Sequence, residues 1–211
     1  VNMFQIDGPV VRFFSILGDM IILNILWIIC CVPIVTIGPA TIAAHYVAMK
    51  LVRDEGRSVK EIFFKSFFCN LKQGMLLGII FTFVGIILGV DLYICIYVIK
   101  DNSIFRILIY SAIIFLILLY LIEMIYLWAV LAMFDTTSIQ AIINAFIISV
   151  SNIKDTSVML AGDIVIVLVA IVSIAFIPQL AILFIIFGVP LIFVLNSFKL
   201  RKIMDKLTLN Q

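Results

Sequence analysis

Three carboxylates lie inside long apolar stretches of the sequence: Asp91, Glu123 and Asp163. A charged side chain is costly in a lipid bilayer, so an acidic residue at membrane depth is a functional candidate by default. The stretch from Ile107 to Ile153 contains no Lys or Arg, and a low-dielectric environment favours the uncharged form of an unpaired carboxyl. The functional hypothesis is a proton or cation site. The structural alternative is a carboxyl that is hydrogen-bonded to Ser, Thr, Tyr or Asn within a helix bundle.

Helix geometry places these acids at different depths. With a rise of about 1.5 Å per residue, Glu123 lies about 18 Å before Asp135, and Asp163 lies about 12 Å beyond Asp155. These two acids are therefore expected at similar depth, where they can share a cavity. Asp91 is expected toward the opposite side of the membrane.

The other reactive residue types form no known catalytic or metal-binding motif. The sequence has one histidine and four cysteines, without C-x-x-C spacing, so no metal or other cofactor is expected. It also lacks G-x-S-x-G, Walker A and H-E-x-x-H patterns, and we therefore expect a protein without enzymatic activity. His45 is either a proton relay or a hydrogen-bonded residue at a helix interface.

The composition indicates the environment in which these residues work. Of 211 residues, 65% are hydrophobic and 12% are charged, about half of the roughly 25% expected in a soluble domain. The net charge of +2 gives no overall field that attracts nucleic acid. This composition excludes a soluble enzyme, a disordered chain and a nucleic-acid-binding domain. It predicts one all-α integral membrane domain over residues 1–211, a polytopic bundle of transmembrane helices in a lipid bilayer.

The apolar stretches predict about five spans. They cover residues 15–32, 74–99 and 104–134, and the charge-free stretch 164–198 is long enough for most of two more spans with a turn at Pro178-Gln179.

Residues 20–49 contain no charge and exceed the roughly 20 residues of one crossing, but Pro33 and Pro39 interrupt them. We expect an irregular segment there, at the interface or inside the bundle, followed by a helix over 40–53. That helix is short for a crossing, which favours five spans over six membrane segments.

Two amphipathic helices are expected at the membrane interface, over residues 58–72 and 138–154. Ser58 and Glu61 have capping-box spacing at the start of the first helix. Its phenylalanines are expected in the headgroup region; they are Phe63, Phe64, Phe67 and Phe68. The two segments show a weak internal repeat, because each combines Ser, a β-branched residue and Ile with a later Asn-x-Lys.

Basic residues predict the orientation. Cytoplasmic loops are rich in Lys and Arg, and residues 50–72 and the tail from Lys199 onward hold most of these residues. Both segments are therefore expected in the cytoplasm. With five spans the N-terminus lies outside, and with six membrane segments it lies inside.

Four glycines lie within about 60° of one face of the helix predicted over 74–99. Their two G-x-x-x-G pairs indicate close approach of a neighbouring helix. They are Gly74, Gly78, Gly85 and Gly89.

Four segments of the chain form a recognisable combination. The most specific is Pro33–Ala40 (PIVTIGPA), which includes Thr36, Gly38 and Pro39. The others are Asp7-Gly8-Pro9, Gly18-Asp19, and the stretch from Phe63 to Gly74 with its Asn70-Leu71-Lys72 sequence. Together these segments resemble the YesL-like family, membrane proteins of unknown function found mostly in Gram-positive bacteria.

The resemblance implies a link to carbohydrate uptake, because genes of the family often lie near genes for sugar-uptake ABC transporters. We therefore expect an accessory or regulatory membrane component, with an ABC sugar permease or a sensor subunit as partner. One alternative is a small secondary transporter that uses the intramembrane carboxylates. Another is a structural or lipid-binding membrane protein, since residues 50–72 are basic enough to attract anionic lipid.

Overall fold

The computed structural model describes residues 9–53, 58–97, 104–176 and 178–208. These residues form helices and short connections, and no strand occurs among them, which confirms the all-α prediction. The elements are α1 (Pro9–Cys31), the 3-10 turn η1 (Ile34–Thr36), α2 (Ile37–Val52), α3 (Val59–Cys69), α4 (Leu71–Tyr97), α5 (Ile104–Met133), α6 (Ser138–Ser151), α7 (Ile153–Phe176) and α8 (Pro178–Thr208).

Within the described residues, five helical stretches are long and apolar enough to cross a membrane. They are Phe14–Cys31, Ile34–Val52, Leu71–Tyr97, Ile107–Met133 and Ile153–Phe176. These stretches support a multi-pass membrane protein. The set includes the stretch around α2, which the sequence analysis treats as short. The difference arises because α2 already begins at Ile37, directly after the turn that follows Pro33, so the stretch reaches 19 residues.

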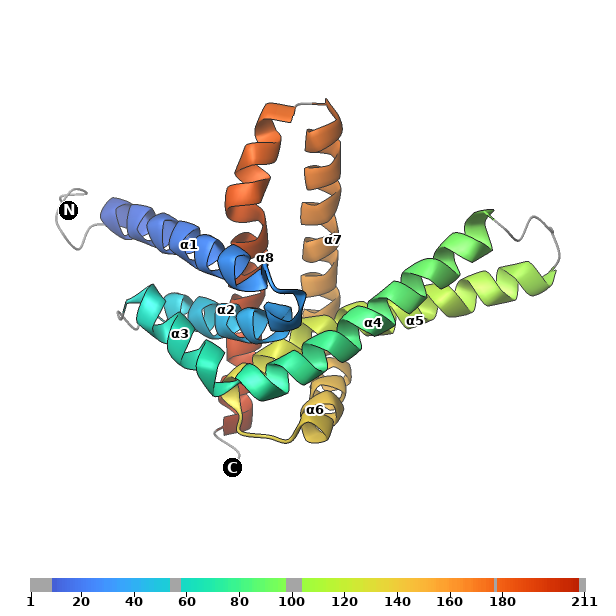
Figure 1. Cartoon of the computed structure of the whole chain (residues 1–211), viewed down its shortest axis with the longest axis horizontal. Helices are drawn as coiled ribbons and strands as arrows, with labels where there is room; N and C mark the ends of the chain where they lie inside the picture. The colour runs from blue at the N-terminus through green and yellow to red at the C-terminus, as the bar shows by residue number, and fades with distance from the viewer. Residues whose placement is uncertain (1–8, 54–57, 98–103, 177, 209–211) are drawn as a thin grey trace.

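Helix α2 lies at the centre of the molecule. It packs against α1, α3, α4, α5 and α8 (Figure 1). Its small side chains allow these neighbours to approach closely, and Ala40, Ala43, Ala44 and Ala48 are all fully buried. The Pro33–Pro39 segment therefore has two parts. Val32 and Ile34 at the turn are exposed, whereas Gly38 and Pro39 are packed inside the bundle.

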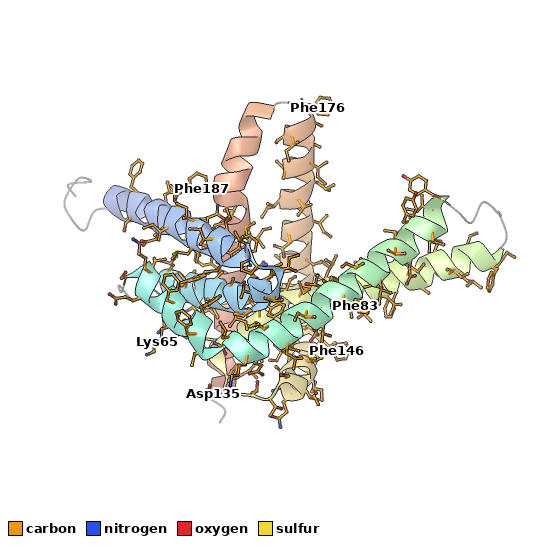
Figure 2. The ribbon with its side chains drawn as sticks, in the orientation of Figure 1. Lys65, Phe83, Asp135, Phe146, Phe176 and Phe187 are labelled. Carbon is orange, nitrogen blue, oxygen red and sulfur yellow. The ribbon has the colours of Figure 1, made fainter. Side chains whose placement is uncertain are left out.

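Two helix pairs extend away from this centre. Helices α4 and α5 run side by side in one direction, and α7 runs beside the first half of α8 in another (Figure 1). Large apolar side chains cover the outer surfaces of α4, α5 and α7; Phe83 is 64% exposed and Phe176 is 80% exposed (Figure 2). Because a soluble protein rarely exposes apolar surface on this scale, a lipid bilayer is the environment that suits these helices.

The weak sequence repeat coincides with a repeated local structure. Helix α3 ends before Asn70 and α4 follows, while α6 ends before Asn152 and α7 follows. In each case the asparagine amide donates a hydrogen bond to the carbonyl oxygen four residues earlier. The distance is 3.0 Å both from Asn70 to Ser66 and from Asn152 to Ile148. A short helix, an asparagine junction and a long helix therefore occur twice.

Helix α3 is more deeply packed than the sequence analysis predicts. Phe63 and Phe67 are buried against α1 and α2, whereas Phe64 and Phe68 are exposed. The prediction that all four rings lie in the headgroup region is therefore wrong for two of them. The reason is tertiary contact, because α3 packs on two other helices.

The predicted capping box does not form. Ser58 is at the N-cap of α3, but its side chain makes no capping hydrogen bond. A capping box is instead present at the start of α6, between Thr137 and Gln140.

Candidate functional site

A cavity of about 490 Å³ lies between α1, α2, α5, α7 and α8. Its wall consists mostly of aliphatic and aromatic side chains, with a few polar groups among them. Its polar and aromatic residues are Trp27, Thr41, His45, Trp128, Asp163, Phe193 and Asn196. A largely apolar cavity with a few convergent polar groups is the usual form of a small-molecule site, so it is the candidate site of this protein.

Asp163 of α7 is the acidic residue of the cavity wall. The side-chain amide of Asn196, on α8, donates to both carboxylate oxygens, over 3.1 Å to Oδ1 and 2.9 Å to Oδ2. Asn196 is buried, and Asp163 is half-buried. The hydrogen bonds expected under the structural alternative are thus present, but the carboxylate also faces a cavity. It is therefore held in position and still available to a ligand.

Aromatic rings from four helices line the same cavity. The indole N–H of Trp27 donates to Thr41 Oγ1 at 3.3 Å, which ties α1 to α2. The centroid of the Phe193 ring lies 6.1 Å from that of Trp27 and 4.7 Å from that of His45. Trp128 of α5 adds a fourth ring to the wall. The site is thus rich in π surface.

Two buried polar atoms of the wall residues lack a hydrogen-bond partner among the described residues. They are His45 Nδ1 and Trp128 Nε1, and each side chain is 3% exposed. An unsatisfied buried polar group costs about 1–3 kcal/mol. The alternative of a fully hydrogen-bonded His45 is therefore not realised. The sequence could not show this, because it depends on which residues surround α2.

The other two candidate acids lie elsewhere. Asp91 is exposed on α4 and is not part of the cavity wall. Glu123 is buried on α5, and its Oε1 atom has no partner in the described part of the chain.

Glu123 does not line the cavity, so the expected shared cavity with Asp163 is absent. The α5 residues that do line it are Leu121, Met124, Ile125 and Trp128. At 100° per residue, they centre about 150° around the helix from Glu123. Although Glu123 and Asp163 are expected at similar depth, only the side chain of Asp163 lines this cavity.

The Pro33–Ala40 motif is placed where α2 crosses α4. A Cβ atom at Gly38 would clash with the backbone carbonyl of Gly74, and one at Gly78 would lie 2.9 Å from the nitrogen of Gly38. Glycine is required because the two backbones touch. At the turn itself, the Thr36 hydroxyl donates to the carbonyl oxygens of Cys30 at 2.6 Å and Pro33 at 2.8 Å.

The second glycine pair differs from the first. A Cβ atom at Gly85 would lie 2.8 Å from the Tyr120 hydroxyl of α5, and one at Gly89 would meet no atom within 4 Å. The prediction of close helix packing therefore fails at Gly89. The reason is that α2 crosses α4 only near its start, and the same face of α4 lies beyond α2 further along.

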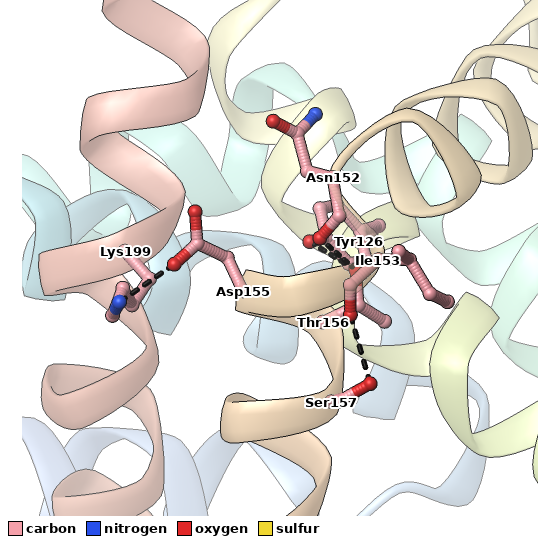
Figure 3. A network of polar contacts seen from close by, with 7 residues as sticks. All are labelled: Tyr126, Asn152, Ile153, Asp155, Thr156, Ser157 and Lys199. Carbon is pink, nitrogen blue, oxygen red and sulfur yellow. Dashed lines mark hydrogen bonds and ion pairs between the residues drawn. The ribbon is translucent and has the colours of Figure 1, made fainter.

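A buried polar network, which the sequence analysis did not identify, joins α5, α6 and α7 (Figure 3). The Tyr126 hydroxyl lies 2.8 Å from Thr156 Oγ1, and the Thr156 hydroxyl is within 2.8 Å of the Ser149 carbonyl and 3.0 Å of the Asn152 carbonyl. Beside it, Lys199 of α8 forms a 2.6 Å ion pair with Asp155. The network fixes the helix junction rather than forming a site.

The two basic segments meet in space. Arg53, just after α2, forms an ion pair with Asp205 of α8. Arg201 lies 3.5 Å from the same carboxylate and donates to the Val52 carbonyl at 3.3 Å. The end of α2 and the end of α8 therefore lie on one side of the molecule, although about 150 residues separate them in sequence.

Residues 20–92 match a family described as "Protein of unknown function, DUF624". This segment contains α2, its glycine contact with α4, and three of the aromatic or polar residues of the cavity wall: Trp27, Thr41 and His45. Neither the comparison with curated proteins nor the comparison with solved structures gave a match.

Proposed function

We propose that this protein is a non-enzymatic, multi-pass protein of the cell membrane that assists or regulates a carbohydrate-uptake system. The observation that carries the proposal is the resemblance of the Pro33–Ala40 motif and its neighbours to the YesL-like family, together with the match over residues 20–92. Gly38 and Pro39 of the motif are buried where α2 crosses α4, so part of the likeness lies at the centre of the molecule.

The partner surface in this proposal is the outer face of α3. Lys60, Glu61 and Lys65 are exposed there beside the exposed rings of Phe64 and Phe68. Together with the predicted cytoplasmic position of residues 50–72, this mixed charged and aromatic face suits contact with a permease or sensor subunit.

Affinity purification from membranes of a Gram-positive host tests this role. A tagged chain should enrich permease or sensor subunits of a sugar transporter after mild cross-linking, and the variant K60Q/K65Q/F68A should recover less of them. An exposed control substitution on α4, F83A, should recover as much as the native chain. Recovery of unrelated proteins alone, from a chain that is stably inserted, would contradict the proposal.

The second candidate is a small secondary transporter, and the cavity beside Asp163 favours it. A carboxylate held at a cavity between helices is a common means of coupling an ion to a substrate. Uptake into proteoliposomes should then fall with D163N, whereas E123Q, outside the cavity wall, and D91N, on the exposed face of α4, should leave it unchanged. Equal uptake by all four proteins would remove this candidate.

A lipid-binding role is the third candidate, supported by the exposed basic residues Lys60 and Lys65 of α3. Basic residues near an anionic membrane surface contribute about 1 kcal/mol each. The purified native chain should then retain more anionic than zwitterionic lipid, and K60Q/K65Q should reduce that preference.

A further inference from the structure

The charged group and the lining residues of the cavity between α1, α2, α5, α7 and α8 indicate which class of ligand it binds. We propose that it binds a monovalent organic cation with an apolar body, whose ammonium group pairs with Asp163. This inference does not rest on the link to carbohydrate uptake. It concerns the ligand of the cavity, and it is independent of which protein partner the chain binds.

The charge balance of the wall is the first argument. Among the described residues that line the cavity, Asp163 is the only acidic one, His45 is the only one with a basic side chain, and there is no lysine or arginine. A carboxylate in apolar surroundings is stable only when a cation or several hydrogen bonds compensate it. The amide of Asn196 supplies two hydrogen bonds from one nitrogen, and each carboxylate oxygen retains a lone pair. The remaining lone pairs of the Asp163 carboxylate can therefore accept hydrogen bonds from a cationic ligand.

The aromatic wall is the second argument. Trp27, Trp128 and Phe193 lie around the same cavity, and the faces of such rings attract cations, most strongly when water is excluded. Ring contacts between Phe193 and its neighbours hold part of this wall in place. Rings and one carboxylate together are the usual means by which proteins recognise substituted ammonium groups.

Size and lining exclude the simpler occupants. A volume of about 490 Å³ is within the roughly 300–1,000 Å³ of small-molecule sites, far more than a bare ion fills. Hard metal cations take six or more oxygen ligands, whereas the described wall offers one carboxylate, one amide and one hydroxyl. An anion would be repelled by Asp163. The aliphatic remainder of the wall, including Leu160, Val167 and Leu168, suits an apolar body.

The protein carries its own reporter for this test. The chain has two tryptophans, Trp27 and Trp128, and both line the cavity. Their fluorescence therefore reports occupation of the cavity without a label. The experiment uses the full chain in a neutral detergent with three probes that share one carbon skeleton: 4-phenylbutylamine, 4-phenylbutanol and 4-phenylbutyrate. Protein-free micelles correct for partition of each probe into detergent.

The expected result is a saturable change of emission with the amine, at least tenfold weaker binding of the alcohol, and no saturable change with the carboxylate. D163N should lower the affinity for the amine about tenfold or more and leave that for the alcohol unchanged. D91N removes an acid from the exposed face of α4 and should behave like the native chain.

The relative affinities of the native chain for the three probes test the proposal without any variant. The proposal can therefore be overturned even if D163N folds poorly. Equal binding of alcohol and amine would overturn it in favour of a neutral amphiphile site. Preferential binding of the carboxylate, or no saturable change with the amine in a chain that is helical by circular dichroism, would overturn it as well. None of these outcomes affects which sugar-transporter subunits the affinity purification recovers, so the two proposals are tested independently.

Discussion

At the scale of single residues, the structure distinguishes three acids that the sequence treats alike. Asp91 lies on an outer surface, Glu123 is buried without contact to the cavity, and Asp163 lies at the cavity with a fixed partner in Asn196. The difference comes from the direction of each side chain around its helix and from the residues on neighbouring helices. Asp163 is therefore the one on which functional substitutions should concentrate.

The network around Thr156 allows a prediction on stability. Tyr126 and Thr156 are almost completely buried, and their hydroxyls are 2.8 Å apart. Y126F and T156V should each destabilise the protein, and T156V should cost more, because its hydroxyl also contacts two backbone carbonyls. The coupling between them should be about 0.6 kcal/mol, the average measured for hydrogen bonds within a membrane protein, and at most about 1.7 kcal/mol.

A double-mutant cycle of reversible unfolding in mixed micelles measures this coupling. S157A is the control, since its hydroxyl is exposed on the next residue of α7 and should change stability by less than about 0.5 kcal/mol. Fully additive costs of the two substitutions would show that the buried contact does not stabilise the junction.

At the scale of helices, the crossing of α2 and α4 is the contact most sensitive to substitution. A methyl group at Gly78 would lie 2.9 Å from the backbone nitrogen of Gly38, and a backbone cannot rotate away as a side chain can. G78A should therefore destabilise the protein by about 1–3 kcal/mol, the usual cost of overpacking.

G89A is the matched control for G78A, because it adds the same methyl group on the same face of the same helix, where no atom lies within 4 Å. It should be neutral or stabilising by up to about 1 kcal/mol, since alanine favours the helix over glycine. Thermal unfolding of both variants in one detergent tests the pair. Equal stability of G78A and G89A would mean that α2 does not cross α4 at this point.

At the scale of the whole molecule, the ion pair between Arg53 and Asp205 joins the two basic segments at one end. The contact between the two basic segments agrees with the rule that basic loops remain in the cytoplasm, because that rule places both segments on the same side of the membrane. Cys69 at the end of α3 is exposed and lies within the first segment, so it can report that side.

A chain that retains Cys69 as its single cysteine should react with a membrane-impermeant maleimide in inverted vesicles and not in right-side-out vesicles. F176C, placed in a chain without native cysteines, is the control for the opposite side, because Phe176 is the exposed residue at the far end of α7. Reaction of both positions from one side would contradict a membrane crossing by α7.

Local patterns predicted much of the fold. The positions of the long helices follow from apolar length and from the proline, glycine and asparagine residues between them, and most predicted helix ends lie within a few residues of those observed. Helix α2 begins at Ile37, three residues before its predicted start. A helix can start within a Pro-x-x-x-x-x-Pro segment when a 3-10 turn and the Thr36 hydroxyl satisfy the freed backbone groups, and spacing alone does not show this.

The sequence by itself determined the helical class, the approximate positions of the long helices and the identity of the few acidic residues inside apolar stretches, because these depend on hydrophobicity and short-range spacing. Only the tertiary structure decided that Asp163 pairs with Asn196, that Phe63 is buried in the bundle, and that Gly38 touches Gly74. Each of these contacts depends on how a helix is rotated toward a neighbour distant in sequence. A lipid-facing and a cavity-facing residue look the same in an apolar stretch until that rotation is known.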